Sequence, residues 1–344
     1  MVRTGRVGLS VMAASALIAA VACGTSSGTP GAEEPEGGAP APESSSRADA
    51  ATTTDSGAKP NDGGDAGPDD SVAPPQLACL AGHFVGTVVN LDELADAGAD
   101  AGADAGRLYD AGAYDAGAGD SGAPLEAERP PSRWGLRLPS GVILPWDDGR
   151  AKTFDETLAR PDLQDTLFLR YRLGTIVPVV ALNDDPGRLR HDELFKATYG
   201  GSAAAVEPRL ERVPFVGQNV RFHDLAAEAL ARVSTRLDAL IAADATLKKY
   251  VTGELGGTYG WRPIANTNRL SVHSYGAAID IRVSESAYWE WDLEQNRFGW
   301  RNAIPQAIVD AFEAEKFAWG GRWYHYDTMH FEYRPELFDP ACQL

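Results

Sequence analysis

Apolar residues recur at steps of three and four positions along residues 223–243. This period places the apolar side chains on one face of an α-helix. The apolar positions are Leu225, Ala229, Val233, Leu237 and Leu240. We therefore predict a helix over this segment.

A strict alternation of apolar and charged residues begins at Ile279. The apolar positions are Ile279, Ile281 and Val283, and the charged positions between them are Asp280 and Arg282. Successive side chains of a β-strand point to opposite faces. We therefore expect a half-buried strand from which Asp280 emerges toward a polar site.

Shorter apolar runs predict further structure. We expect that a strand lies within 79–91 and that another covers 140–146. The runs at 166–171 and 176–180 favour more β or buried structure. From residue 134 onward the composition is typical of a globular domain.

Composition divides the chain of 344 residues. Residues 24–75 are mainly Gly, Pro, Ala, Ser, Thr and acid, and cannot bury enough apolar surface to fold, so we predict a disordered tether over 23–75. An Asp-Ala-Gly run at 96–122 indicates a disordered insertion, with a calcium-binding repeat as the alternative. The folded region then has an N-terminal part, 76–220, and a domain with the candidate chemistry, 221–344.

The first 22 residues have the features of an export signal. Arg3 and Arg6 precede an apolar run that is short for a membrane span of about 20 residues. The sequence Ala20-Val21-Ala22-Cys23 resembles the site at which bacterial lipoproteins are cleaved and acylated. We expect a lipid anchor on Cys23 and a location in the cell envelope outside the cytoplasm, on the periplasmic or outer-membrane side. An ordinary cleaved signal peptide is the alternative.

The formal charge of -18 is concentrated outside the candidate domain. Residues 24–131 hold 20 Asp and Glu against 4 Lys and Arg. No basic patch suggests a nucleic-acid partner, and we expect a monomer. Cys79 and Cys342 flank the folded region, and export favours a disulfide between them. Two unpaired buried thiols are the alternative, since sequence does not set connectivity.

Two motifs in the last 75 residues pair histidine with aspartate. His273 lies seven residues before Asp280, in a segment that Gly276 allows to turn. Asp327 lies three residues before His330, so on a regular strand the two would face opposite sides. We predict a bulge or turn near 328–329 that brings both toward one metal ion. Zinc accepts imidazole and carboxylate ligands, and two histidines with one carboxylate leave a position open for water.

These motifs resemble a known family. The Ser-x-His and Asp pattern at 271–280, followed by Asp-x-x-His at 327–330, is similar to the VanY-type D-alanyl-D-alanine carboxypeptidases and L-alanyl-D-glutamate peptidases. These zinc enzymes act on peptidoglycan peptides. The resemblance covers roughly 259–337 and includes the segments 261–264 and 319–323.

The resemblance implies a role for each matching residue. The implied ligands of one zinc ion are His273, Asp280 and His330. Asp327 matches the general base, Arg262 an arginine that holds substrate and stabilises the oxyanion, and Ser271 a serine of the substrate site. A guanidinium suits its role because it offers several donors and stays charged.

Some neighbouring residues have alternative interpretations. His325 is the main rival ligand, and we expect it outside the metal shell or at the surface. Glu332 orients His330 or pairs with Arg334. Five tryptophans could line a glycan groove, but packing is the simpler interpretation. They are Trp289, Trp291, Trp300, Trp319 and Trp323.

The resemblance also implies the fold and the reaction. We expect an α+β fold, with an antiparallel sheet, helices packed on one side and zinc in an open cleft. The expected activity is removal of a terminal D-alanine from peptidoglycan stem peptides. The alternatives are an endopeptidase that cuts between L-Ala and D-Glu, and a zinc-containing wall-binding module without hydrolysis.

Overall fold

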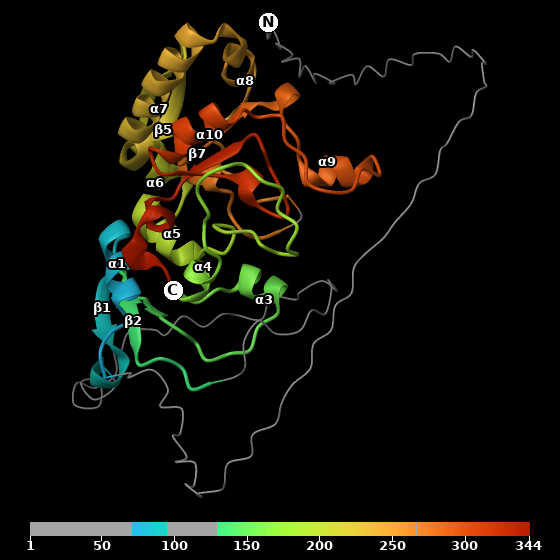
Figure 1. Ribbon diagram of the computed structural model, residues 1–344. Helices are drawn as coiled ribbons and strands as arrows, with labels where there is room; N and C mark the ends of the chain where they lie inside the picture. Colours follow the sequence, from blue (N-terminus) through green and yellow to red (C-terminus); the bar gives the residue numbers. More distant parts are fainter. Residues whose placement is uncertain (1–70, 95–128, 266) are drawn as a thin grey trace, which may run out of the picture. The chain divides into compact units, whose positions relative to one another are not determined.

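The computed structural model describes residues 71–94, 129–265 and 267–344 (Figure 1). The export signal, Cys23, most of the tether and the Asp-Ala-Gly insertion lie outside these residues. The described part combines helices with antiparallel sheets, which confirms the α+β class. Within it, no helix is long and apolar enough to cross a membrane.

The first described segment forms a helix and a small sheet. Helix α1 (Pro75–His83) precedes β1 (Thr87–Asn90), which pairs antiparallel with β2 (Trp134–Arg137), and β2 pairs with β3 (Ile143–Pro145). The prediction of a strand within 79–91 is therefore right only for its second half. Leu77 and Leu80 lie three apart and are both buried, which a helix achieves and a strand does not.

A disulfide joins Cys79 of α1 to Cys342 of the 3-10 turn η7 (Pro340–Cys342). It links two positions that are 263 residues apart in the sequence. The disulfide thus ties the start of the described fold to its end, as expected from the sequence.

Short helices occupy the next segment. They are α3 (Phe154–Ala159), α4 (Asp165–Phe168), α5 (Asp192–Tyr199) and α6 (Ala203–Val206), followed by the turn η1 (Glu207–Arg209). The prediction of β or buried structure at 176–180 is wrong, because this run is a loop without a strand and Val180 is 81% exposed. The run at 166–171 is not a strand, since α4 covers its start, but it is partly buried as predicted, through Thr166, Leu167 and Tyr171. The apolar composition of a run does not show whether another strand is available to pair with it.

A hairpin and a long helix follow. Strands β4 (Leu210–Phe215) and β5 (Gln218–His223) pair antiparallel and lead into α7 (Asp224–Ala243). The His223 side chain caps α7 by accepting the N–H of Leu225. The buried face of α7 includes Val233 and Leu237, so the helical prediction is confirmed. The turn η2 (Ala245–Leu247) and the helix α8 (Lys248–Val251) come next.

The last part of the chain builds a four-stranded antiparallel sheet with the order β6-β7-β9-β8. Its strands are β6 (Leu255–Gly257), β7 (Ala278–Arg282), β8 (Phe317–Trp319) and β9 (His330–Tyr333). The helices between them are α9 (Trp289–Glu294) and α10 (Gln306–Glu313). Five 3-10 turns complete the order: η3 (Val272–Tyr275), η4 (Val283–Glu285), η5 (Gly320–Arg322), η6 (Pro335–Phe338) and η7.

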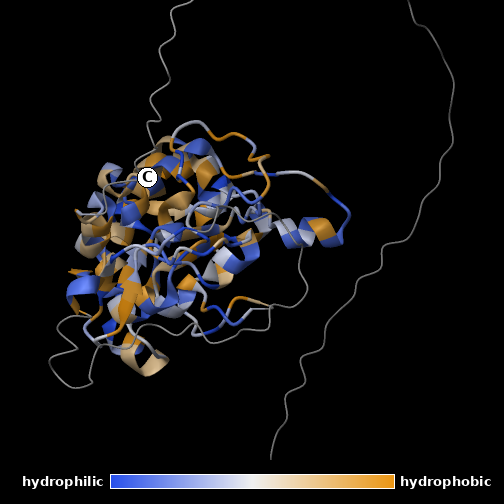
Figure 2. Cartoon of the chain, turned by 90° about the horizontal axis from the view of Figure 1, so that it is seen from below, coloured by the Kyte–Doolittle hydropathy of each residue, from blue (hydrophilic) through white to orange (hydrophobic). Residues whose placement is uncertain are grey.

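The two faces of this sheet differ in character. Ile279 pairs with Phe331, and Phe331 pairs with Trp319, so these side chains share one face. They belong to the core that also includes buried residues of α7 and α10, and the ring of Phe312 stacks on Phe331 at 3.9 Å between centroids. The helices carry hydrophobic and hydrophilic residues side by side, as expected of elements with one buried face (Figure 2). The other face of β7 and β9 carries the polar residues.

Candidate functional site

His273 is held by a short turn with defined ends. The hydroxyl of Ser271 accepts the backbone N–H of His273 at the start of η3. Gly276 ends the turn with a φ of 63°, in the left-handed region, and a β-carbon there would lie 2.5 Å from a Leu210 methyl group. Glycine is the residue that tolerates this conformation and this approach. The predicted turn is confirmed, and it places the His273 ring beside β7.

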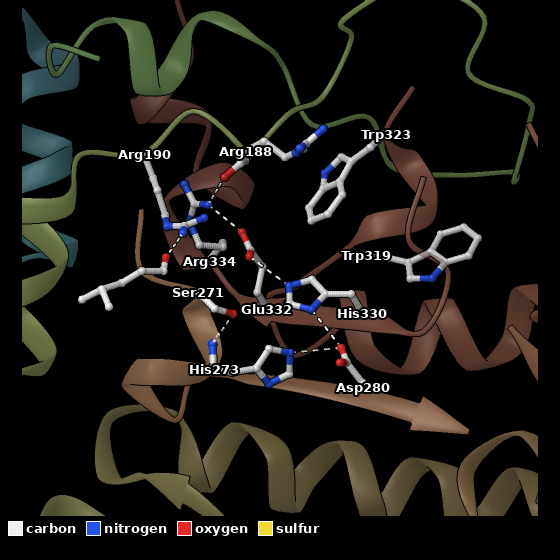
Figure 3. A network of polar contacts seen from close by, with 12 residues as sticks. Arg188, Arg190, Ser271, His273, Asp280, Trp319, Trp323, His330, Glu332 and Arg334 are labelled. Atoms are coloured by element: carbon white, nitrogen blue, oxygen red, sulfur yellow. Dashed lines mark hydrogen bonds and ion pairs between the residues drawn. The ribbon is translucent and has the colours of Figure 1, made fainter. Parts of the chain in front are cut away.

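The strand register brings Asp280 beside His330. These two residues are direct partners in the β7–β9 ladder, so their side chains share a face. One carboxylate oxygen of Asp280, Oδ1, lies 3.1 Å from His273 Nε2 and 3.0 Å from His330 Nδ1. Figure 3 shows both imidazole rings directed at this carboxylate.

The hydrogen bonds of the outer ring nitrogens determine which nitrogen carries the proton in each neutral ring. His273 Nδ1 lies 3.1 Å from the carbonyl oxygen of Thr258, and His330 Nε2 lies 3.1 Å from Glu332 Oε2. Both outer partners are acceptors, so each ring donates its N–H outward. In the neutral rings the inner nitrogens then carry lone pairs, and both face a carboxylate oxygen.

Three acceptors that converge in this way fit a cation. The three ligand atoms lie within 4.8 Å of one another. A tetrahedral zinc ion with bonds of about 2.0–2.1 Å holds its ligand atoms roughly 3.3 Å apart, close to the separations here. His273 and His330 are buried, and each has a second partner that fixes its ring. The residues therefore fit zinc in type, spacing and orientation.

The local electrostatics match this arrangement. Burial disfavours the charge of Asp280, but the two histidines outweigh it and hold the pKa of Asp280 well below its ordinary value. Burial also disfavours charge on His330, but Asp280 and Glu332 outweigh it and raise the pKa of His330 to about 10. The carboxylates around His330 thus favour positive charge at this position, either as a second proton on the ring or as a bound metal ion that replaces it.

Asp327 reaches the same region through a turn. Residues 328–329 form this turn, in which the N–H of His330 donates to the carbonyl oxygen of Asp327 at 3.2 Å. The predicted break between the two residues is confirmed. Oδ1 of Asp327 is buried and has no hydrogen-bond partner within the described chain. Burial and the charge of Asp280 raise the pKa of Asp327 to about 7.

Glu332 has both of the partners that the sequence suggested. Its Oε2 accepts from His330, and its Oε1 accepts from Arg334 Nη1 at 2.7 Å. Arg334 is 1% exposed and also donates to Glu336 and to the carbonyl oxygen of Gly187. This chain of buried charges fixes the His330 ring from behind (Figure 3).

Arg262 and Ser271 lie on the same structural unit as His273. The backbone of Arg262 bonds to the Ser274 hydroxyl and to the N–H of Ser271. The Arg262 side chain is exposed, and the structure shows no hydrogen bond or ion pair for its guanidinium within the described residues. Ser271 is 6% exposed and caps η3, so its visible contact is to His273.

His325 lies outside the group of converging ligands. Its Nδ1 is 2.6 Å from Asp185 Oδ2, and its ring packs against Trp289 at 4.7 Å between centroids. Trp319 and Trp323 are buried, which agrees with packing roles, whereas Trp291 is 40% exposed.

No sequence signal predicts that residues 184–188 lie near the site, yet each of them accepts a hydrogen bond from a residue around it. Tyr324 donates to the carbonyl oxygen of Asp184, His325 to the Asp185 carboxylate, Trp323 to the carbonyl of Pro186, Arg334 to that of Gly187 and Arg269 to that of Arg188. The proline and glycine of this segment indicated a turn, but no sequence signal indicated its partners. This segment therefore packs beside the chain that carries the second histidine–aspartate motif.

Residues 265–333 match a family model described as D-alanyl-D-alanine carboxypeptidase. The match confirms the resemblance to VanY-type peptidases and includes both histidine–aspartate motifs. Arg262 lies just before the matched segment. No curated protein and no solved structure matches the chain.

Proposed function

We propose that this protein is a zinc-dependent peptidase that hydrolyses peptidoglycan stem peptides. The observation that carries the proposal is the convergence of His273, Asp280 and His330, whose inner atoms can all bind a metal ion when both rings are neutral. The family match supports a peptidase, and the ligand set is the two-histidine, one-carboxylate kind found in catalytic zinc sites.

Zinc bound by these three residues would polarise the scissile carbonyl and acidify the attacking water. The chain's own residues supply the remaining steps. Asp327 accepts a proton from the attacking water, and its free Oδ1 is available for that proton. The exposed guanidinium of Arg262 stabilises the negative charge that develops on the carbonyl oxygen.

The proton and bond changes balance. Water adds its oxygen to the carbonyl carbon as Asp327 takes one proton. The carbon–nitrogen bond then breaks, and Asp327 returns the proton to the departing amine. The products are a carboxylic acid, which keeps the other proton of the water, and an amine; the acid then loses this proton to solvent or to the amine, and Asp327 is ready for another cycle.

Removal of a terminal D-alanine is the activity that we propose first, because the matching family model carries that description. Cleavage between L-Ala and D-Glu is the second candidate, since the same residues would perform it. A binding module without hydrolysis is disfavoured, because such a module does not need a buried carboxylate oxygen without a partner beside the ligands. We also propose that the protein is held at the cell envelope by a lipid on Cys23, as its N-terminal sequence suggests.

Defined muropeptides test this proposal. The purified protein is incubated with a pentapeptide that ends in D-Ala-D-Ala, and the product masses are measured. Loss of one alanine supports the carboxypeptidase, and cleavage after L-Ala supports the endopeptidase. A pentapeptide that binds but stays intact with zinc present would contradict the peptidase.

A further inference from the structure

The Arg188 side chain is fixed at one end and open at the other. Its Nη1 lies 3.1 Å from Oδ2 of Asp185, a carboxylate whose side chain is fully buried. The Arg188 side chain itself is 23% exposed. Its other guanidinium nitrogens have no partner within the described residues. Arg188 therefore presents free N–H donors from a rigid support.

The support of Arg188 is built into the surroundings of the site. Asp185 also bonds to the backbone and ring of His325, two residues before Asp327. Gly187, with a φ of 96°, lies so close to the Glu332–Arg334 pair that a β-carbon there would be 3.3 Å from Arg334 Nη1. The segment 184–188 therefore contacts both the chain that leads into the Asp327 turn and the Glu332–Arg334 pair.

The Arg188 guanidinium is held on the side of the site where Asp327 lies. The Asp185 carboxylate bonds both to Arg188 Nη1 and to the backbone N–H and ring of His325, which lies two residues before Asp327. A cation thus lies on the Asp327 side of the site.

The substrate residue that is released is expected on the Asp327 side of the site. Asp327, in the proposed function, returns its proton to the departing amine, so the residue that carries this amine must lie beside it. In a D-Ala-D-Ala end, the released amine stands on a carbon that bears the free terminal carboxylate. In an L-Ala-γ-D-Glu bond, it stands on a carbon that bears the free α-carboxylate. Both candidate substrates therefore bring a carboxylate next to the amine.

We propose that Arg188, held by Asp185, binds the free carboxylate on the residue whose amine is released. The inference rests on the proposed peptidase function and deepens it, because it defines the substrate class as peptides with a carboxylate next to the scissile amide nitrogen. Arg262 then stabilises the carbonyl oxygen, and Arg188 selects the leaving residue. A planar guanidinium is suited to carboxylates because it can donate two parallel hydrogen bonds.

Matched substrates test this division of roles. One pair is a muropeptide pentapeptide with a free terminal carboxylate and the same peptide as its C-terminal amide. The other is an L-Ala-γ-D-Glu peptide and its α-amide. KM and kcat are measured for the zinc-loaded wild-type protein, for Arg188→Gln and for Arg172→Gln. Arg172 is the control, because it pairs with Asp184 of the same segment and its side chain is 68% exposed.

We expect the wild-type protein to prefer the free acid of whichever pair it cleaves. Arg188→Gln should raise KM for that acid about 10- to 100-fold, the scale of a lost charged hydrogen bond, and change kcat little. Its KM for the amide should stay near the wild-type value, which also shows that the variant is folded. Arg172→Gln should behave as wild type on both peptides.

Three outcomes would overturn the inference. If the wild-type protein cleaves acid and amide equally well, the enzyme does not recognise the free carboxylate of the leaving residue, although the peptidase function stands. If Arg188→Gln weakens cleavage of acid and amide to the same extent, Arg188 has only a structural role. If the wild-type protein cleaves none of the four peptides, the proposed function fails and the inference fails with it.

Discussion

Two clusters of potential metal ligands in this molecule have similar spacing, but they differ in the charged groups that they contain. Asp147, Asp148 and Asp162 lie close enough to hold one ion, as do His273, Asp280 and His330. In the first cluster the ammonium group of Lys152 lies 3.0 Å from Asp148, 2.9 Å from Asp162 and 2.7 Å from Asp165. In the second cluster, two imidazole nitrogens face one carboxylate oxygen of Asp280, and no lysine or arginine of the described residues bonds to these atoms.

This difference shows which cluster needs an external cation. Burial disfavours the charge of Lys152, but Asp162 and Asp165 outweigh it, so the lysine pKa lies above its ordinary value. The first cluster thus contains its own cation. Among the described residues, no lysine or arginine bonds to the ligand atoms of the histidine cluster, and each ring directs its other nitrogen to an outer acceptor. Positive charge at this cluster is a proton on a ring, which a bound metal ion would replace. The charges that each cluster contains, and not the number of acids, favour the histidine cluster as the proposed metal site.

Removal of one ligand should have the largest effect. We expect His330→Ala to lose its zinc and to cleave muropeptides only at background rate, because two remaining ligands hold zinc weakly. Metal analysis and product masses measure both losses. His325→Ala is the matched control and should keep a full zinc content. Full zinc in His330→Ala would instead make His325 the ligand.

Removal of the internal cation should turn the first cluster into an unstable one. Lys152→Met leaves buried carboxylates unpaired, so we expect the free energy of unfolding to fall by about 3–5 kcal/mol. Thermal or denaturant unfolding measures the loss. Added calcium should restore part of the stability of this variant and leave the wild-type protein unchanged. Equal stability of the two proteins would show that Lys152 does not balance the cluster.

Asp327→Asn should separate metal binding from catalysis. The amide has nearly the same size, but it is a far weaker base, so we expect kcat to fall about 100-fold or more. Zinc content should stay at the wild-type level. The control is Asp310→Asn on α10, an exposed carboxylate that should tolerate the change. An active Asp327→Asn variant would end the assignment of Asp327 as the base.

The smallest effect is expected at Glu332, which bonds to the outer ring nitrogen of His330. Glu332→Gln keeps an acceptor for the ring but loses its charge, so zinc affinity should fall about 10- to 100-fold, the usual scale for an outer partner of a metal ligand. Competition with a chelator of known affinity measures the change. Glu336→Gln is the control, because Glu336 bonds to the same Arg334 but does not contact His330. Equal affinities in both variants would show that Glu332 does not tune the site.

The local structure around the candidate ligands was predicted better than the distant contacts of this region, for physical reasons. Alternation places Asp280 on the polar face of a strand, and the spacing from Asp327 to His330 requires a turn, so both features are local. The helix over α7 is also a local pattern. These are the parts that the structure confirms.

The missed parts depend on distant contacts. The run at 176–180 is apolar, but nothing in the sequence says whether another strand pairs with it, and the structure shows an exposed loop. Arg188 precedes Asp327 by more than a hundred residues, and its placement depends on the buried Asp185 and on His325. A single sequence holds no record of such pairings.

In the proposed function, the histidine cluster holds the zinc ion that hydrolysis requires. The most direct measurement is the zinc content of the wild-type protein, with its cleavage of a defined muropeptide before chelation, after chelation and after zinc is restored. We expect one zinc per chain, loss of cleavage when the metal is removed, and recovery with one equivalent of zinc. Cleavage that continues at full rate in zinc-free protein would contradict it.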